Sequence, residues 1–155
     1  MCLYTNESKA VEIDKDIVCY KTVFLDEKTM AIMSAIKYFA YNMGETYNEK
    51  NWWGLAEDLQ VSSHEFLKLK YEVNIGFHSF KKYWDAYGAK HGSCEYILKC
   101  VIPKGSMVFT GKTYTGEDSY CSNSIKILAY RKIGGSGWWT KPGVKFKEKL
   151  AKKRK

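Results

Sequence analysis

A histidine and a serine stand side by side in the segment Gly76-Phe77-His78-Ser79-Phe80. An imidazole beside a hydroxyl group is suited to general acid–base chemistry or to activation of a nucleophile. We expect the glycine to form a tight turn that presents both side chains. Two structural alternatives stay open: His78 can hydrogen-bond to the main chain of the turn, and Ser79 can cap a helix over residues 80–87.

The sequence lacks the motifs that several other kinds of active or binding site require. There is no Gly-x-Gly-x-x-Gly, no Walker lysine and no Gly-x-Ser-x-Gly elbow. The three histidines are isolated and no Cys-x-x-Cys occurs, so we predict no metal site. We expect the five cysteines to be reduced and mostly buried as small apolar residues; they are Cys2, Cys19, Cys94, Cys100 and Cys121.

Three strands are predicted to support the His-Ser segment. Residues 17–24 are β-branched and aromatic, and residues 120–130 are typical of a late strand. The clearest strand covers 94–102, because its apolar residues alternate and so share one face: Cys94, Tyr96, Leu98, Cys100 and Ile102. We expect all three strands to lie in one sheet.

Helices and turns are predicted between these strands. Asp26 is placed to cap a helix that runs from Glu27 to about Phe39. A short helix is expected over Lys81–Tyr87, stopped by Gly88 and packed on the sheet. Pro103-Lys104-Gly105 is expected to be a turn, since proline presets φ and glycine accepts a positive φ.

The length and the order of elements favour one α+β domain with a mainly antiparallel sheet and interposed helices. We assign residues 1–133 to this domain and residues 134–155 to a glycine-rich hinge and a basic tail. No run of apolar residues is long enough to span a membrane, and the N-terminus does not resemble a signal peptide. We therefore expect a cytoplasmic protein.

Positive charge is concentrated in the tail. The chain has 25 basic and 17 acidic residues, a net charge of +8. Residues 141–155 alone carry +7, which leaves +1 for the rest. The tail either aids solubility as a solvated segment or binds a polyanion such as RNA or DNA. Its candidate polyanion-binding residues are Lys141, Lys145, Lys147, Lys149, Lys152, Lys153, Arg154 and Lys155.

Four segments together resemble a family of small uncharacterised proteins from bacteriophages and gut bacteria. They are Tyr41-x-x-Gly44-x-x-Tyr47, Gly76-Phe77-His78-Ser79, Ile102-Pro103-Lys104-Gly105 and Ser122-Asn123-x-Ile125. The resemblance covers about residues 1–130, and the family brings no established activity. The order of a strand with a basic residue, a Gly-Phe-x-Ser segment, a helix and a strand is also similar to ADP-ribosyltransferase-like folds, including RNA 2′-phosphotransferases.

The second resemblance implies a site for a nicotinamide dinucleotide (NAD). Lys21 stands where such folds hold the cofactor from their first strand, and His78 and Ser79 stand where the stacking wall begins. Tyr96 completes this candidate ligand-binding set. Many such transferases also use a glutamate on a late strand. Here Glu117 is expected in a turn, and the late strand offers Ser122-Asn123-Ser124 in its place.

These observations favour an accessory protein, encoded by a phage, that acts by binding a protein or a polyanion without robust catalysis. The first alternative is an NAD-dependent ADP-ribosyltransferase-like enzyme. The second is a nucleic-acid-associated structural protein that docks through its basic tail. The pairs Trp52-Trp53 and Trp138-Trp139 act either as binding platforms or in packing of the core or a lid.

Overall fold

The structure is a computed structural model that describes residues 3–26, 31–34, 40–41, 46–48, 57–58, 69–73, 76–88, 96–133 and 139. In chain order its elements are β1 (Leu3–Thr5), β2 (Val11–Glu12), β3 (Ile17–Asp26), β4 (Ala31–Ser34), β5 (Ala40–Tyr41), β6 (Thr46–Asn48), β7 (Glu57–Asp58), β8 (Tyr71–Val73), β9 (Phe77–Phe80), α1 (Tyr83–Gly88), β10 (Tyr96–Ile102), β11 (Met107–Lys112), β12 (Asp118–Ser122) and β13 (Ser124–Lys132). Within these residues the fold is mostly antiparallel sheet with one short helix.

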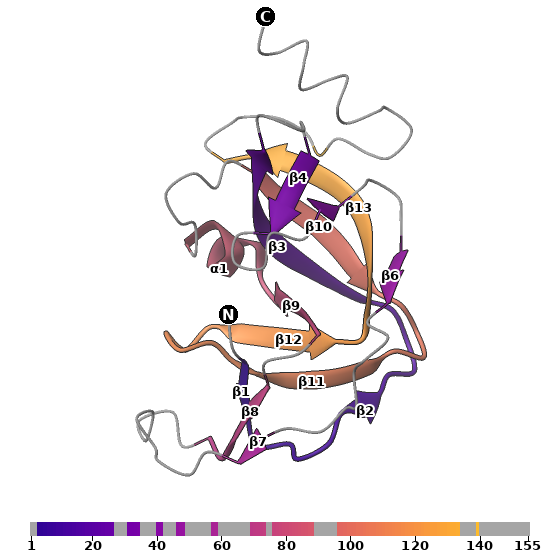
Figure 1. The fold of residues 1–155 in the computed structure, drawn as a ribbon, viewed down its shortest axis with the longest axis vertical. Helices are drawn as coiled ribbons and strands as arrows, with labels where there is room; N and C mark the ends of the chain where they lie inside the picture. The colour runs from indigo at the N-terminus through magenta and orange to yellow at the C-terminus, as the bar shows by residue number, and fades with distance from the viewer. Residues whose placement is uncertain are drawn as a thin grey trace, which may run out of the picture.

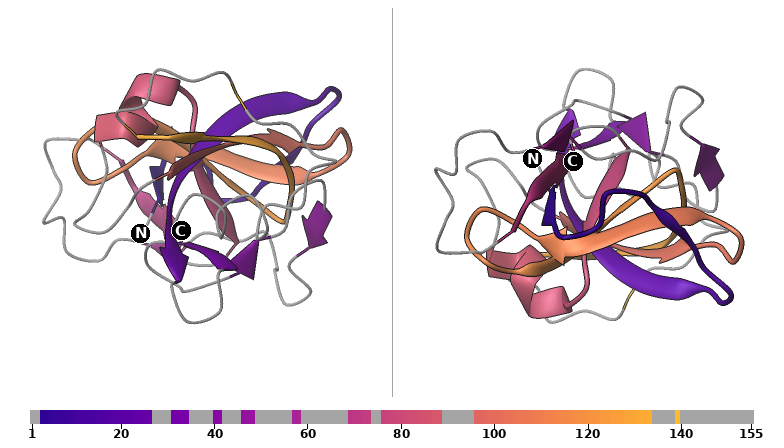
Figure 2. Two further views of the ribbon diagram at one scale, coloured as in Figure 1. Left: turned by 90° about the horizontal axis from the view of Figure 1, so that it is seen from above. Right: turned by 90° about the horizontal axis from the view of Figure 1, so that it is seen from below.

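All strands of the described residues belong to one sheet (Figure 1). Its main path runs β6-β13-β10-β3-β9-β12-β11-β1-β8-β7, while β2, β4 and β5 attach to its sides. Every described strand pair is antiparallel. The views in Figure 2 show that the long strands are twisted, so the sheet curves instead of lying flat. The expected common sheet of residues 17–24, 94–102 and 120–130 is confirmed for their described parts.

The main core lies on one side of the central strands, which we call the inner face. Side chains alternate between the two sides of a strand, so every second residue of β10 points inward. The inward residues of β10 are Tyr96, Leu98, Cys100 and Ile102, as the apolar alternation predicts. They pack with apolar side chains of β3, β9, β11, β12 and β13, including Cys19, Val23, Phe77, Val108, Tyr120, Ile125, Ile127 and Tyr130.

Helix α1 packs on the opposite, outer face of the sheet, beside β3 and β9 (Figure 1). Ala86 of the helix is fully buried against Phe80 and Ile97 in a second, smaller core. The Thr22 hydroxyl of β3 donates a hydrogen bond of 2.6 Å to the main-chain carbonyl of Ala86. The predicted short helix before Gly88 is therefore confirmed, although it begins at Tyr83 and includes the glycine.

The helix predicted from Glu27 to Phe39 is wrong where the structure describes it. Residues Ala31–Ser34 form β4, which pairs with β3 on one side and with β5 on the other. A short apolar run fits a helix or a strand equally well when only its periodicity is considered. Here the end of β3 that extends beyond its pairing with β9 provides hydrogen-bonding partners, and this tertiary pairing decides the conformation.

The strand predicted over 120–130 is two strands that meet at Asn123. The main-chain N–H of Asn123 donates to the carbonyl of Met107 (3.2 Å), and the Met107 N–H donates to Asn123 Oδ1 (3.0 Å). Asn123 thus satisfies main-chain groups at a corner where the chain changes neighbours. Before the corner, β12 pairs with β9 and β11; after it, β13 pairs with β10 and β6.

Glycine turns are placed as the sequence predicts, with one correction. Gly105 has a φ of 88°, and the Ser106 N–H donates to the Pro103 carbonyl (3.1 Å), which confirms the turn after β10. Gly76 also has a positive φ, of 105°. The residues after it, however, form strand β9 and not a turn. Among the described residues, no helix is both long and apolar enough to cross a membrane.

Candidate functional site

The four candidate ligand-binding residues come from three neighbouring strands and are all buried. Lys21 lies between Cys19 and Val23 on the inner face of β3, and Tyr96 lies on the inner face of β10. Ser79 alternates with Phe77 on the inner face of β9, whereas His78 points to the other side. The structure therefore brings Lys21, Ser79 and Tyr96 to one face and separates the imidazole from them.

The ammonium group of Lys21 is directed at the protein itself. Lys21 is only 9% exposed, and its Nζ donates a hydrogen bond to the main-chain carbonyl of His78. A buried cation is costly unless it is hydrogen-bonded, and this carbonyl provides the acceptor. Lys21 therefore links β3 to β9 from within the core. The burial of Lys21 shows that its side chain does not face solvent.

Ser79 is not a helix cap, because it lies within β9 and α1 begins four residues later at Tyr83. Its fully buried hydroxyl makes no hydrogen bond of ordinary geometry within the described part of the chain. It does interact with the nearby Cys19 thiol. Burial tends to raise the pKa of Cys19, but Cys100, Ser79 and the charge of Lys21 together lower it.

The His78 ring meets a different cysteine. Its Nε2 lies 3.8 Å from the Sγ of Cys121, which faces it from β12 in the paired register. Cys121 is fully buried and belongs to a separate cluster with Leu3, Val73 and Phe109. His78 therefore packs in the interior on the far side of the sheet from Lys21. Within the described ranges, no three His, Cys, Asp or Glu side chains gather as metal ligands would.

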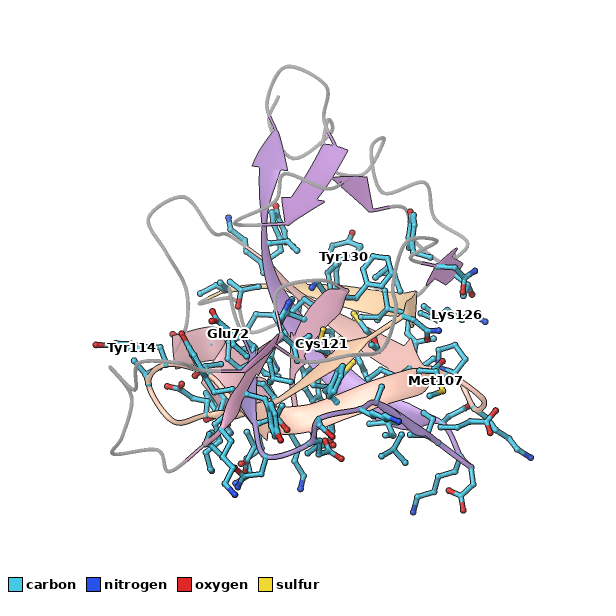
Figure 3. All side chains as sticks on the ribbon, turned by 60° about the horizontal axis from the view of Figure 1, so that its bottom comes forward. Glu72, Met107, Tyr114, Cys121, Lys126 and Tyr130 are labelled. Carbon is cyan, nitrogen blue, oxygen red and sulfur yellow. The ribbon has the colours of Figure 1, made fainter. Side chains whose placement is uncertain are left out.

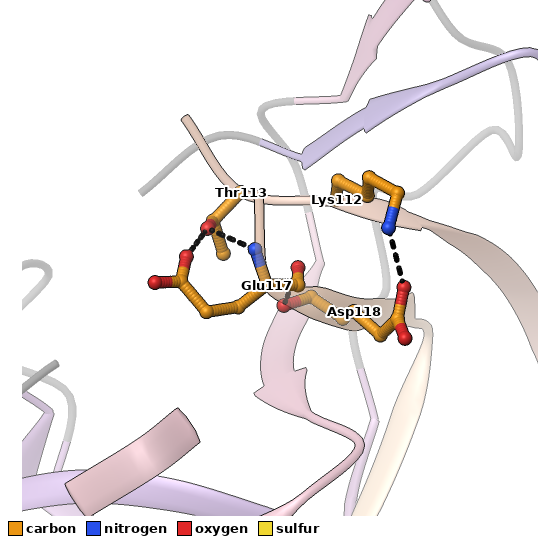
Figure 4. A network of polar contacts seen from close by, with 5 residues as sticks. Lys112, Thr113, Glu117 and Asp118 are labelled. Carbon is orange, nitrogen blue, oxygen red and sulfur yellow. Dashed lines mark hydrogen bonds and ion pairs between the residues drawn. The ribbon is translucent and has the colours of Figure 1, made fainter. Parts of the chain in front are cut away.

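Glu117 lies in the turn before β12, where the sequence predicts it (Figure 4). Its carboxylate accepts hydrogen bonds from the hydroxyls of Thr113 and Thr115. Burial tends to raise the pKa of Glu117, but these hydrogen bonds lower it overall. Next to it, Asp118 forms an ion pair of 2.9 Å with Lys112, which lowers the pKa of Asp118. Both carboxylates are thus engaged in holding the β11–β12 hairpin.

A second constellation, on the outer face, was not predicted. Five aromatic side chains from three parts of the chain meet around α1, and we call this group the aromatic face: Tyr20, Tyr83, Trp84, Tyr87 and Trp139. Tyr83 lies at its centre, with ring centroids 5.9 Å from Tyr20 and 5.7 Å from Trp139, both edge-on. The guanidinium carbon of Arg131 lies 5.6 Å from the Tyr83 ring centroid.

Trp84 is the accessible member of the aromatic face. It is 73% exposed, yet its ring is supported edge-on by Tyr83 at 5.1 Å and by Tyr87 at 5.7 Å. Lys99 lies opposite Tyr20 in the paired register. Lys81 and Lys82 directly precede α1 and are exposed, and their charges act on Asp118. Asp85 of α1 is the acidic residue nearest in sequence. The surface therefore combines aromatic rings and cationic groups with the carboxylate of Asp85.

The sequence carries a partial signal for this surface. Tyr83, Trp84 and Tyr87 recur at the spacing of one helical turn, but Tyr20, Arg131 and Trp139 join them only through the fold. The half-buried ring of Trp139 packs against the second core, which confirms for this residue the packing alternative given for Trp138-Trp139. Trp52, Trp53, Trp138 and the eight candidate residues of the basic tail lie outside the described residues.

No protein-family model matches the chain, and no curated protein or solved structure is similar enough to indicate a relative. The resemblances to the phage family and to ADP-ribosyltransferase-like folds therefore stay predictions. The geometry of the two candidate sites carries the functional argument.

Proposed function

We propose that the protein acts by binding, and that its ligand is single-stranded nucleic acid held on the aromatic face. The observation that carries this proposal is the 73% exposure of Trp84 on a fixed support. A contiguous apolar surface, unlike a single scattered residue, marks interaction sites, and Trp84 extends the half-buried rings of Tyr83 and Tyr87 into solvent. An exposed ring that neighbouring rings hold in one position is suited to stacking.

The support of Trp84 is held in place because α1 is anchored to the sheet at Ala86. Ala86 of α1 is buried against the sheet, and the hydrogen bond from the Thr22 hydroxyl to the Ala86 carbonyl joins the helix to β3. Tyr83 and Tyr87 then pack between the helix and the sheet. A preorganised ring loses little conformational freedom when a base stacks on it, which favours affinity.

The charges around the aromatic face match a phosphate backbone. Lys99 stands opposite Tyr20, the Arg131 guanidinium lies over the Tyr83 ring, and Lys81 and Lys82 directly precede α1. The chain continues from Trp139 into the segment that carries +7. Binding of nucleic acid by cationic side chains releases counterions, and stacking on aromatic rings adds a contribution that every base can make. Lys99 and Arg131 thus provide cationic groups beside the rings on the outer face.

Unpaired bases fit this arrangement better than a duplex does. In a duplex the faces of the bases are stacked on one another and are not accessible to a side chain. A single strand offers both accessible base faces and phosphates. The basic tail alone would favour any polyanion, so Trp84 is the feature that selects single strands.

Fluorescence anisotropy with three labelled oligonucleotides of equal length tests the proposal: a single strand, the corresponding duplex and an abasic strand. We expect the single strand to bind most tightly at moderate salt, because only it combines phosphates with free bases. The abasic strand has the same backbone charge and controls for electrostatics. Equal affinities for the single strand and the abasic strand would overturn the stacking role of the aromatic face.

The accessory role implied by the phage-family resemblance is compatible with this proposal. A protein that binds single-stranded nucleic acid can act on replication, transcription or host defence without chemistry of its own. We propose that any such interaction uses the same aromatic face and the basic tail, which includes Lys141 and Lys155.

A second candidate function is an NAD-dependent transferase with an ADP-ribosyltransferase-like fold. The observation that favours it is the shared inner face of Lys21, Ser79 and Tyr96. Against it stand the burial of all three side chains and the engagement of the Lys21 ammonium by the His78 carbonyl. Calorimetric titration with NAD tests it: heat that is lost in Lys21→Ala would support a cofactor site.

A further inference from the structure

Cys19 and Cys100 form a buried pair of thiols that plays no part in the proposed nucleic-acid binding. The two residues stand directly opposite each other in the antiparallel pairing of β3 with β10. Both side chains point into the main core, and both residues are fully buried. In the sequence they are far apart, on strands whose pairing partners are not evident from the residues alone.

The position of the pair meets the geometric demands of a disulfide. Residues opposite each other on antiparallel strands have Cα atoms about 4.5–5.5 Å apart. Disulfides span Cα separations of about 4.4–6.8 Å, and the two side chains must point to the same side. The register between β3 and β10 is continuous from Tyr96 to Ile102, so no bulge on this side displaces Cys100 from Cys19.

We propose that Cys19 and Cys100 are a redox modification site at which a peroxide forms a reversible disulfide between β3 and β10. The Cys19 sulfur attacks one oxygen of the peroxide and becomes a sulfenic acid, while the other oxygen leaves as an alcohol or water. The Cys100 sulfur then attacks the Cys19 sulfur, and the sulfenic hydroxyl leaves as water with the Cys100 proton. Two thiols and one peroxide thus give one disulfide, one alcohol (or water) and one water.

The groups around the two thiols decide which thiol attacks the peroxide and which one resolves the sulfenic acid. Burial tends to raise the pKa of Cys19, but Cys100, Ser79 and the charge of Lys21 outweigh it and lower the pKa. Burial and the neighbouring Cys19 raise the pKa of Cys100. The thiolate is the form that attacks a peroxide, so Cys19 is the attacking group and Cys100 the resolving group. Because both are buried, oxidation waits for a transient opening and a small oxidant such as hydrogen peroxide reaches the pair best.

The third described cysteine provides a matched control. Cys121 is equally buried, but it lies on the other side of the sheet beside the His78 ring. In the part of the chain that the structure describes, no other cysteine belongs to its cluster. It is therefore expected to take no part in the disulfide.

Intact-mass spectrometry of the native protein, before and after hydrogen peroxide and quenching with catalase, tests the proposal. We expect the loss of two hydrogen masses, reversal by dithiothreitol and a peptide linking Cys19 to Cys100 after alkylation and digestion without reductant. Cys121→Ser should behave as the wild type does, and Cys19→Ser should not lose the two hydrogens. A version that retains only Cys19 and Cys100 removes alternative pairings.

Three results would contradict the proposed disulfide. Accumulation of sulfinic acid on Cys19 would show that Cys100 does not reach it, and a disulfide mapped to any other pair would contradict the register argument. No oxidation at all, under conditions that oxidise the unfolded chain, would show that the pair is inert. Should the two-cysteine version fail to fold, the linked peptide from the wild-type protein decides the question alone.

Discussion

Lys21 of β3 donates a hydrogen bond from its ammonium group to the main-chain carbonyl of His78 in β9, inside the core. This bond joins two residues that the sequence places together in a cofactor site, but it joins them as structural partners. The His78 imidazole points to the opposite side of the sheet, toward Cys121. His78, whose imidazole suggests acid–base chemistry in the sequence, thus contributes its main-chain carbonyl to this hydrogen bond.

Replacement of Lys21 by methionine should lower stability without affecting nucleic-acid binding. Methionine keeps the apolar stem but leaves the buried His78 carbonyl without this donor, which costs about 1–3 kcal/mol. Urea unfolding measures the change. Lys104→Met, at an exposed lysine of the turn after β10, is the control and should stay within about 0.5 kcal/mol of wild type. Unchanged stability in Lys21→Met would refute the structural role.

Gly111 is predicted to be intolerant of any side chain. A Cβ at this position would lie 2.1 Å from the main-chain oxygen of Tyr4, because β1 passes close to β11 there. Gly111→Ala should therefore destabilise the protein by about 1–3 kcal/mol, since a backbone atom and not a flexible side chain must move. Thermal unfolding measures it.

Gly88 at the end of α1 is the matched control for Gly111. Apart from its chain neighbours and the backbone of its own helix, no atom of the described residues lies within 4 Å of a Cβ built there, so Gly88→Ala should be neutral or stabilising by up to about 1 kcal/mol. Equal losses in the two variants would mean that the close approach of β1 to β11 is not what makes Gly111 necessary.

Acid should weaken the β11–β12 hairpin. The folded-state pKa values of Glu117 and Asp118 are lowered from their ordinary values of 4.5 and 3.8. A lowered carboxyl pKa contributes stability that is complete above the ordinary value and is lost as the pH falls through the folded value. Urea unfolding below pH 4.5 should show this loss, and Glu117→Gln should reduce its pH-dependent part. The same reduction in Glu12→Gln, at an exposed carboxylate of β2, would contradict the assignment.

A chain that ends at Trp139 should keep its thermal midpoint but bind single-stranded nucleic acid more weakly. Removal of the tail takes away eight basic residues and Glu148. The slope of log affinity against log salt should become less steep by about 0.7 for each phosphate that the tail no longer neutralises. Anisotropy at several salt concentrations measures both quantities. An unchanged slope would assign the tail to solubility alone.

The sequence predicts the positions of the long strands well, but it predicts their pairing and register poorly. The alternation in 96–102 correctly identifies the inward residues of β10, and Gly105 correctly marks the turn after that strand. The turn expected from Gly76 to Phe80 is instead strand β9. Which face of β3 becomes buried, and that Cys19 meets Cys100, depends on register between distant strands. Local residue patterns do not contain that information, because register is set by the packing of the whole sheet.

The same reason explains the errors. Residues 31–34 pair with the edge of β3, so the helix expected there does not form in the described part. The aromatic face escapes prediction because Tyr20, Tyr83 and Trp139 come from three distant segments. Only the Tyr83-Trp84-x-x-Tyr87 spacing is local, and a short helix with aromatic residues is compatible with simple core packing.

The role of Trp84 is tested most directly by the affinity of Trp84→Ala for a labelled single-stranded oligonucleotide. Stacking of a base on an aromatic ring contributes about 1–3 kcal/mol, so Kd should rise by about 5- to 150-fold. Tyr114→Ala is the control, because Tyr114 is 58% exposed and projects from the β11–β12 turn (Figure 3), which contributes no residue to the aromatic face. The proposal predicts a Kd near the wild-type value for Tyr114→Ala. Equal Kd values for the wild type and a folded Trp84→Ala would contradict the proposed function.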